Sequence, residues 1–200
     1  MKTKTCIFAI LLAVSLLNSR AQDSWTQKAN FPGGFGRYAA TGFSIDSKGY
    51  MGTGYDFYLG HQRDLWEYDP VTNAWTQKAD LGGVARGAAV GFAINGKGYI
   101  GTGSNFGGDH KDFWEYDPQS NAWTRKADFG GTARDFAVGF SIGRKGYIGT
   151  GNDGINNHRD FWEYDPSTNL WTQKTDFGGT ARTWATGFSI GSKGYIGTQC

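Results

Sequence analysis

One sequence pattern recurs along this chain of 200 residues with a period of about 48 residues. The pentapeptide Trp-Glu-Tyr-Asp-Pro begins at Trp66, Trp114 and Trp162, always 48 residues apart. Two further segments recur with it: Trp-Thr-x-Lys from Trp25, Trp75, Trp123 and Trp171, and Gly-Tyr-(Met/Ile)-Gly-Thr from Gly49, Gly98, Gly146 and Gly194. A fixed period of this length is typical of solenoids and propellers, in which each unit is stable only against its neighbours.

Each unit contains four short strand-like segments, a to d. In the second copy they span residues 88–94, 97–102, 112–116 and 122–127. Asn95-Gly96 predicts a two-residue hairpin turn between strands a and b, because both residues suit positive φ, and Gly143-Arg144 and Gly191-Ser192 suit a type II′ turn. Four antiparallel strands per unit predict a β-propeller blade, whereas a β-sandwich would not require near-identical units.

Composition agrees with this all-β fold. Glycine supplies 32 residues and aromatic side chains 16% of the chain, which favours tight turns and packed rings and excludes a disordered chain. The sequence therefore predicts a leading strand d at 24–29, blades at about 35–79, 84–127 and 132–175, and a partial blade at 180–200. Because the last set of strands is incomplete, we interpret the chain as a fragment of a longer product. The alternatives are an open arc, or closure of the ring by self-association through the open propeller ends.

The spacing of tyrosine and tryptophan within the units points to a family. Six residues separate the two side chains in the pairs Tyr68 and Trp75, Tyr116 and Trp123, and Tyr164 and Trp171. This pattern resembles kelch-repeat propellers, a group that includes galactose oxidase-like proteins. The glycine pair of that family is altered here to Gly-Thr-Gly at residues 52–54, 101–103 and 149–151. We expect these tyrosines, together with Trp66, Trp114 and Trp162, to pack between blades.

The first residues read as an export signal. Lys2 and Lys4 precede an apolar run over residues 7–17, and Ser19-Arg20-Ala21 gives a small-x-small cleavage pattern. We predict a signal peptide at 1–21, since this run is too short to span the ~30 Å hydrocarbon core. Its removal leaves 17 basic and 18 acidic residues. We therefore expect a secreted, periplasmic or cell-surface protein that neither inserts into membranes nor binds nucleic acid.

Alternating strand direction puts the a–b and c–d turns on one side of a blade, and the longer d–a and b–c loops on the other. One arginine per copy lies where the d–a loop meets strand a: Arg37, Arg86, Arg134 and Arg182. We expect this ring near the mouth of a central channel, where guanidinium groups can bind carboxylates. The resemblance supports this expectation, because some kelch adaptors bind acidic peptides with arginines near this position. The alternative is that each arginine pairs with a neighbouring carboxylate or a loop carbonyl.

The b–c loops hold the other candidate ligand-binding residues. They carry every histidine of the chain, namely His61, His110 and His158, and the first loop adds Tyr55 and Tyr58. The tyrosines can stack on sugar rings or cover the top of the blade. We predict no metal site, because ligands must converge to about 2.0–2.2 Å from a metal and equivalent positions on successive blades are well separated.

These features predict a non-catalytic interaction module that binds protein or glycan ligands through the d–a and b–c loops, without a cofactor. Near-identical copies favour this function, because an active site needs different residues held in one constellation. One alternative is a galactose oxidase-like or sialic-acid mutarotase-like enzyme whose active site needs further blades. The oxidase chemistry requires a Cys–Tyr crosslink, and after loss of the leader only Cys200 remains. The other alternative is a structural surface or adhesion protein.

Overall fold

A computed structural model describes residues 24–197 of the chain. The predicted signal peptide and Cys200 lie outside the described residues. All regular elements between residues 24 and 197 are β-strands, as the sequence predicted. This part of the chain contains no helix with the length and apolar character needed to cross a membrane.

Three sheets have four antiparallel strands each, a two-stranded sheet follows them in the chain, and two further small sheets lie in the loops. The first contains β2 (Thr41–Ile45), β3 (Lys48–Gly52), β6 (Leu65–Asp69) and β7 (Ala74–Lys78). The second contains β8 (Val90–Ile94), β9 (Lys97–Gly101), β12 (Phe113–Asp117) and β13 (Ala122–Lys126). The third contains β14 (Val138–Ile142), β15 (Lys145–Gly149), β16 (Phe161–Asp165) and β17 (Leu170–Lys174), and the two-stranded sheet is formed by β18 (Thr186–Ile190) and β19 (Lys193–Gly197).

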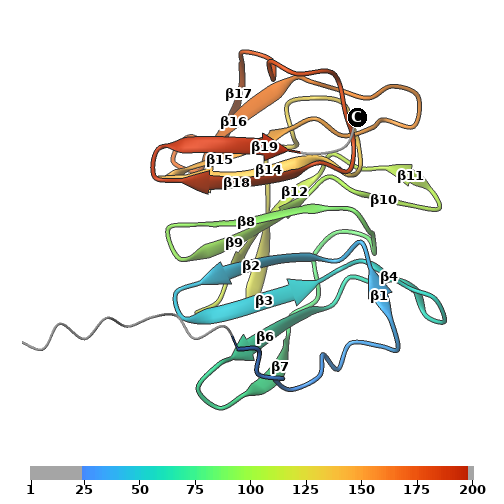
Figure 1. Ribbon diagram of the computed structural model, residues 1–200, viewed down its shortest axis with the longest axis vertical. Coiled ribbons are helices and arrows are strands. Elements are labelled where there is room, and N and C mark those ends of the chain that lie inside the picture. The colour runs from blue at the N-terminus through green and yellow to red at the C-terminus, as the bar shows by residue number, and fades with distance from the viewer. Residues whose placement is uncertain (1–23, 198–200) are drawn as a thin grey trace, which may run out of the picture.

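The innermost strands hold the sheets together. Strands β2, β8, β14 and β18 contact one another in succession, and Figure 1 shows them next to one another through the centre of the molecule. Each sheet then runs outward to its fourth strand in chain order. The protein is therefore a β-propeller segment of three complete blades and part of a fourth, and strands begin or end within two residues of the positions predicted for the second copy.

The segment 24–29 was predicted to be a strand, and this was wrong. In the complete blades strand d pairs with strand c of its own blade, and no described strand lies in that place beside residues 24–29. The segment still docks on the first blade through Ala29. Its N–H donates to Asn73 Oδ1 at 2.9 Å, and its carbonyl accepts from Trp75 Nε1 at 3.1 Å.

Short pairings in the loops escaped the sequence analysis. Strand β4 (Tyr55–Asp56) pairs with both β1 (Arg37–Tyr38) and β5 (Gly60–His61). Strand β10 (Ser104–Asn105) pairs with β11 (Gly108–Asp109). A two-residue strand is too short to show alternation of apolar and polar residues, so no sequence pattern predicts it.

The predicted hairpin turns are present. Asn95 and Gly96 have φ of 51° and 75°, as a type I′ turn requires. Gly143 and Gly191 both have φ of 58°. The residue after each of these glycines has negative φ, as expected of a type II′ turn. These tight turns set the register of strands a and b in each blade.

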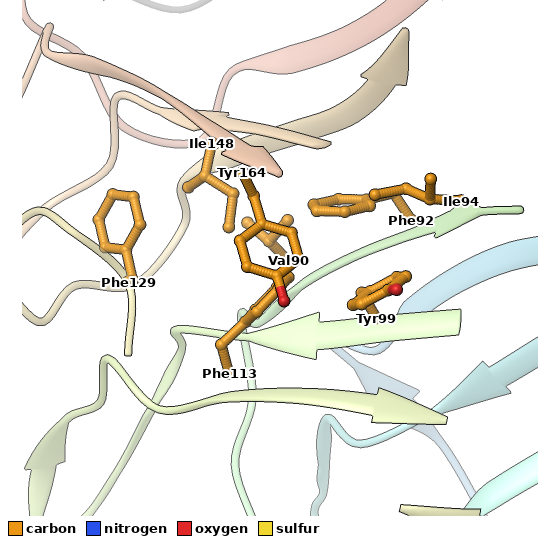
Figure 2. Close-up of a cluster of buried hydrophobic side chains, with 8 residues drawn as sticks. All are labelled: Val90, Phe92, Ile94, Tyr99, Phe113, Phe129, Ile148 and Tyr164. Atoms are coloured by element: carbon orange, nitrogen blue, oxygen red, sulfur yellow. The ribbon is translucent and has the colours of Figure 1, made fainter. Parts of the chain in front are cut away.

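Aromatic rings fill the space between neighbouring blades. Figure 2 shows one such cluster, formed by Val90, Phe92, Ile94, Tyr99, Phe113, Phe129, Ile148 and Tyr164. Phe113 is fully buried, and its ring centroid lies 4.9 Å from that of Tyr164 and 5.0 Å from that of Trp171. Rings from the second and third blades therefore share one core.

A glycine in strand b makes this close packing possible. In the third blade, Gly146 lies against the ring of Phe92 from the second blade, and a Cβ at Gly146 would overlap that ring. The same arrangement places Gly98 against Phe43 and Gly194 against Phe140. The glycine-rich composition thus reflects contacts between blades as well as turns.

A hydrogen-bonded seam explains the spacing of tyrosine and tryptophan. The hydroxyl of Tyr116 donates to Asn121 Oδ1 at 2.9 Å, and the same oxygen accepts from the backbone N–H of Ala79 in the preceding blade at 2.9 Å. Trp123 Nε1 donates to the carbonyl of Ala79 at 2.9 Å. The equivalent groups at the other seams are Tyr68, Asn73 and Trp75, and Tyr164, Asn169 and Trp171. The Tyr–Asn–Trp set therefore ties each blade to the outer strand or segment before it.

Candidate functional site

The loops that differ between copies gather on one side of the propeller, which we call the loop face. It consists of the d–a and b–c connections, including β1, β4, β5, β10 and β11, and several of these strands lie at the right of Figure 1. The tight a–b turns lie on the opposite side, the turn face. Variable loops on a rigid scaffold are the usual place for a binding site.

The arginines lie inside the loop face rather than on it. Arg86 is fully buried, and its Nη1 and Nη2 donate to the two carboxylate oxygens of Asp112 at 2.6 and 2.8 Å. Nη1 also donates to the carbonyl of Thr102 at 3.0 Å, and Nε to that of Val84 at 3.0 Å. Burial alone would raise the pKa of Asp112, but hydrogen bonds from Arg86 and Trp114 keep it below its usual value.

The same pairing recurs in the other complete blades. Arg134 is fully buried and donates to Asp160 at 2.5 and 3.0 Å, and Arg37 pairs with Asp64. The predicted ligand-binding ring is therefore wrong for these three arginines, because their guanidinium groups are shielded from solvent and already paired. Arg182 makes similar local contacts: its Nε donates to the carbonyl of Thr180 at 3.1 Å, and its guanidinium carbon lies 4.8 Å from the ring centroid of Phe177.

Each of the three arginines paired with an aspartate also stabilises an unusual backbone bend. Thr102 has φ of 59°, a left-handed conformation that β-branched residues rarely adopt, and its carbonyl accepts from Arg86. Gly103, which follows it with φ of 86°, donates its N–H to the carbonyl of Arg134 in the next blade at 2.8 Å. The arginines thus join strands within a blade and blades to one another.

The three histidines have three different environments. His61 lies between Tyr55 and Phe106, with ring centroids 4.9 and 4.8 Å away. His158 Nε2 lies 2.9 Å from Asp153 Oδ2. The ring Nε2 of His110 is buried and has no hydrogen-bond partner among the described residues. Among the described residues, no three His, Cys, Asp or Glu side chains are grouped as metal ligands.

The loop face has a hollow of about 330 Å³ between the first two blades, which we call the aromatic hollow. It is lined by Tyr38, Ala39, Tyr55, His61, Gly87, Ala88, Ser104, Asn105, Phe106 and Phe136. Of the predicted site residues, the structure places Tyr55 and His61 here. Tyr58 lies at the loop tip instead, packed against Phe35 and Phe57.

The rings of the hollow form a continuous wall. The ring centroid of Tyr55 lies 5.2 Å from that of Tyr38 and 5.9 Å from that of Phe106. Phe106 is 86% exposed, and its ring contacts the rings of Tyr55 and His61. Burial lowers the pKa of His61 below its ordinary value, so this ring is neutral at pH 7. The wall is therefore uncharged and presents a ring to solvent.

Carboxylates lie beside the wall. Ser104, which lines the hollow, donates its hydroxyl to Asp135 Oδ2 at 2.8 Å. Burial raises the pKa of Asp135. Burial and the charges of Asp135 and Asp153 raise the pKa of Asp109 to about 6. The charge near the hollow is thus negative, the reverse of the sign that an exposed arginine ring would give.

The raised pKa of Asp109 predicts a pH-dependent stability. Its value lies above that of an unfolded chain, so the folded state binds the proton more tightly and gains stability as pH falls from about 7 to 4. We expect Asp109→Asn to raise the melting temperature at pH 7.5 and to change it much less at pH 4.5. Asp165, whose pKa is lowered to about 2 mainly by Lys145, is the matched control: Asp165→Asn should lower the melting temperature at pH 7.5. A destabilising Asp109→Asn at pH 7.5 would contradict the assignment.

Sequence analysis missed several residues of this surface, including Tyr38, Phe106, Phe136 and Trp184. Phe136 and Trp184 occupy equivalent positions and have φ of 47° and 58°, and their rings stack with centroids 3.5 Å apart. The equivalent residues of the first two blades are Ala39 and Ala88, which have φ of 52° and 53°. A signal was available, since these positions vary among copies that are otherwise nearly identical.

Comparison with known proteins extends the description of the fold. No family model and no curated protein matches this chain. A solved structure described as "Structure of YjhT" is similar, with a TM-score of 0.69 and 21% sequence identity over 82% of this chain. The chain spans 59% of the length of that structure. At this identity the likeness concerns the fold alone, and it agrees with the chain being a β-propeller segment built from four-stranded antiparallel blades.

Proposed function

We propose that this chain is an exported, kelch-type interaction module without catalytic activity, which binds protein or glycan ligands through its loop face. One observation carries the proposal: the copies differ most where they line the aromatic hollow, and they repeat one another in the seams and ion pairs that hold the blades together. A repeated scaffold with variable loops is the arrangement of a binding protein.

Exposed aromatic side chains support a binding surface on this face. Phe35, Phe57 and Tyr58 are 87%, 77% and 76% exposed, and they lie in or beside the loops of the first blade. Trp184 is 57% exposed in the d–a connection of the last sheet. Large apolar patches on a soluble protein commonly mark an interaction site.

The repeated ionic groups favour binding over catalysis. The Arg86–Asp112 and Arg134–Asp160 pairs occupy the same place in successive blades and join loop to strand. An ion pair with the same structural role in each copy does not supply the set of different residues that a single active site needs. The kelch resemblance and the predicted leader suggest where such a module would act: outside the cytoplasm.

Binding of the chain to arrays of glycans and peptides tests this function. We expect a ligand whose binding is weakened by Tyr38→Ala on the loop face and unaffected by Val71→Ala, an 89% exposed residue in the c–d turn on the turn face. Both variants should keep the circular dichroism spectrum of the parent chain. Binding that depends on Val71 instead, or no ligand on either array, would overturn the proposal, and the latter result would favour the structural or adhesion alternative.

A further inference from the structure

We infer that the aromatic hollow binds a neutral saccharide. This inference rests on the proposed function and names the ligand class for the same face. A volume of about 330 Å³ lies at the lower end of the ~300–1,000 Å³ usual for small-molecule sites. It therefore suits one or two sugar rings, whereas a folded partner would need a broad surface.

The wall offers what the face of a sugar needs. The electron-rich faces of aromatic rings attract the weakly positive C–H bonds that a pyranose presents on its less polar face. Phe106 is the most exposed of the lining rings, and it packs edge-to-face against Tyr55 and His61. A ligand stacked on Phe106 would bury a ring that is now in water.

Polar groups at the same place suit sugar hydroxyls. Tyr38 and Tyr55 contribute hydroxyl groups that can both donate and accept a hydrogen bond. Within residues 24–197 neither hydroxyl has a hydrogen-bond partner, unlike those of Tyr50 and Tyr99, which donate to glutamates. Ser104 adds a third hydroxyl at the hollow, already oriented by Asp135.

The charges select against acidic ligands. Asp135 and Asp109 lie beside the hollow, and the arginines of the same blades are neutralised by their own aspartates. Bringing a sialic acid or an acidic peptide next to these carboxylates would cost repulsion, and none of the described residues that line the hollow is a lysine or arginine that could offset it. Neutral sugars avoid this cost.

The experiment presents neutral oligosaccharides, each beside its sialylated counterpart, on an array that also carries peptides. We expect the chain to bind neutral glycans and to bind each sialylated counterpart at least tenfold more weakly. The best neutral glycan is then titrated by calorimetry against variants. Phe106→Ala should weaken binding about tenfold through lost stacking, and Tyr38→Phe should weaken it several-fold through one lost hydroxyl.

Two variants make the test specific. Val71→Ala is the control, because Val71 is an exposed apolar residue on the turn face that does not line the hollow, and its variant should bind as the parent does. Asp135→Asn should reduce the discrimination against sialylated glycans. The three substituted side chains other than Asp135 are exposed. Thermal melts confirm that each of the four variants is folded.

The outcomes separate this inference from the proposed function. Preference for sialylated glycans, or an unchanged affinity of Phe106→Ala for the neutral glycan, would overturn the inference. Binding of peptides alone that still depends on Tyr38 would also overturn it and leave the proposed function standing. No binding to the array at all would overturn both.

Discussion

Arg134→Ala is expected to lower the free energy of unfolding by about 3–5 kcal/mol, the usual effect of removing one partner of a buried ion pair. Arg134 is fully buried and donates to both oxygens of Asp160 and to the carbonyl of Thr150 at 2.9 Å. Without the guanidinium, Asp160 would keep a largely buried charge, and Thr150 would lose the contact that holds its left-handed backbone, with φ of 60°. Urea denaturation followed by circular dichroism measures the change.

A double-mutant cycle shows whether the pair acts as a unit. The variant lacking both Arg134 and Asp160 should be more stable than the sum of the single losses predicts, because the stranded charge is gone. The exposed pair Arg125–Asp128, at 2.9 Å, is the control, and Arg125→Ala should change the stability far less than Arg134→Ala, because solvent screens an exposed pair. An equally small loss for Arg134→Ala would show that the buried pair does not hold the blade.

Phe113→Ala is expected to lower the free energy of unfolding by about 3–5 kcal/mol. The ring is fully buried between the second and third blades, against Tyr99, Tyr164 and Trp171. Its removal leaves a cavity that two sheets cannot both close, since their separation is fixed by the seams and by the innermost strands. Thermal unfolding followed by calorimetry would measure the loss.

Matched substitutions separate packing from general damage. Phe113→Leu keeps most of the volume and should cost well under half as much as the alanine variant. Phe57→Ala removes an exposed ring of the same kind and should change the melting temperature by little. Equal losses for the alanine and leucine variants would mean that the shape of the ring, rather than the filled volume, sets the stability.

The fold could be predicted because its determinants are local and repeated. Asn95-Gly96 specifies its own turn, and the 48-residue period marks each unit independently. The segment 24–29 was misassigned, although its sequence is that of strand d, because a strand exists only when a neighbour pairs with it. Sequence similarity between copies carries no information about which neighbour is present.

The candidate site was harder to predict because it depends on partners distant in sequence. Arg86 and Asp112 are 26 residues apart, as are Arg134 and Asp160, and Arg37 and Asp64 are 27 apart. This nearly constant spacing was visible and favours ion pairing. Whether an arginine contacts solvent depends on burial, however, and burial arises only when blades stack. The hollow likewise needs Tyr38, Tyr55 and Phe106 from two blades, and only the three-dimensional arrangement brings them together.

The Tyr–Asn–Trp seam allows a protein of this kind to gain or lose whole blades. Each seam takes two side-chain anchors from one unit and nothing but main-chain atoms, around Ala29, Ala79 or Ala127, from its predecessor. Any unit can therefore follow any other without compensating substitutions. Duplication or loss of the coding sequence for one 48-residue unit would lengthen or shorten the arc by a whole blade and keep the hydrogen bonds of every seam.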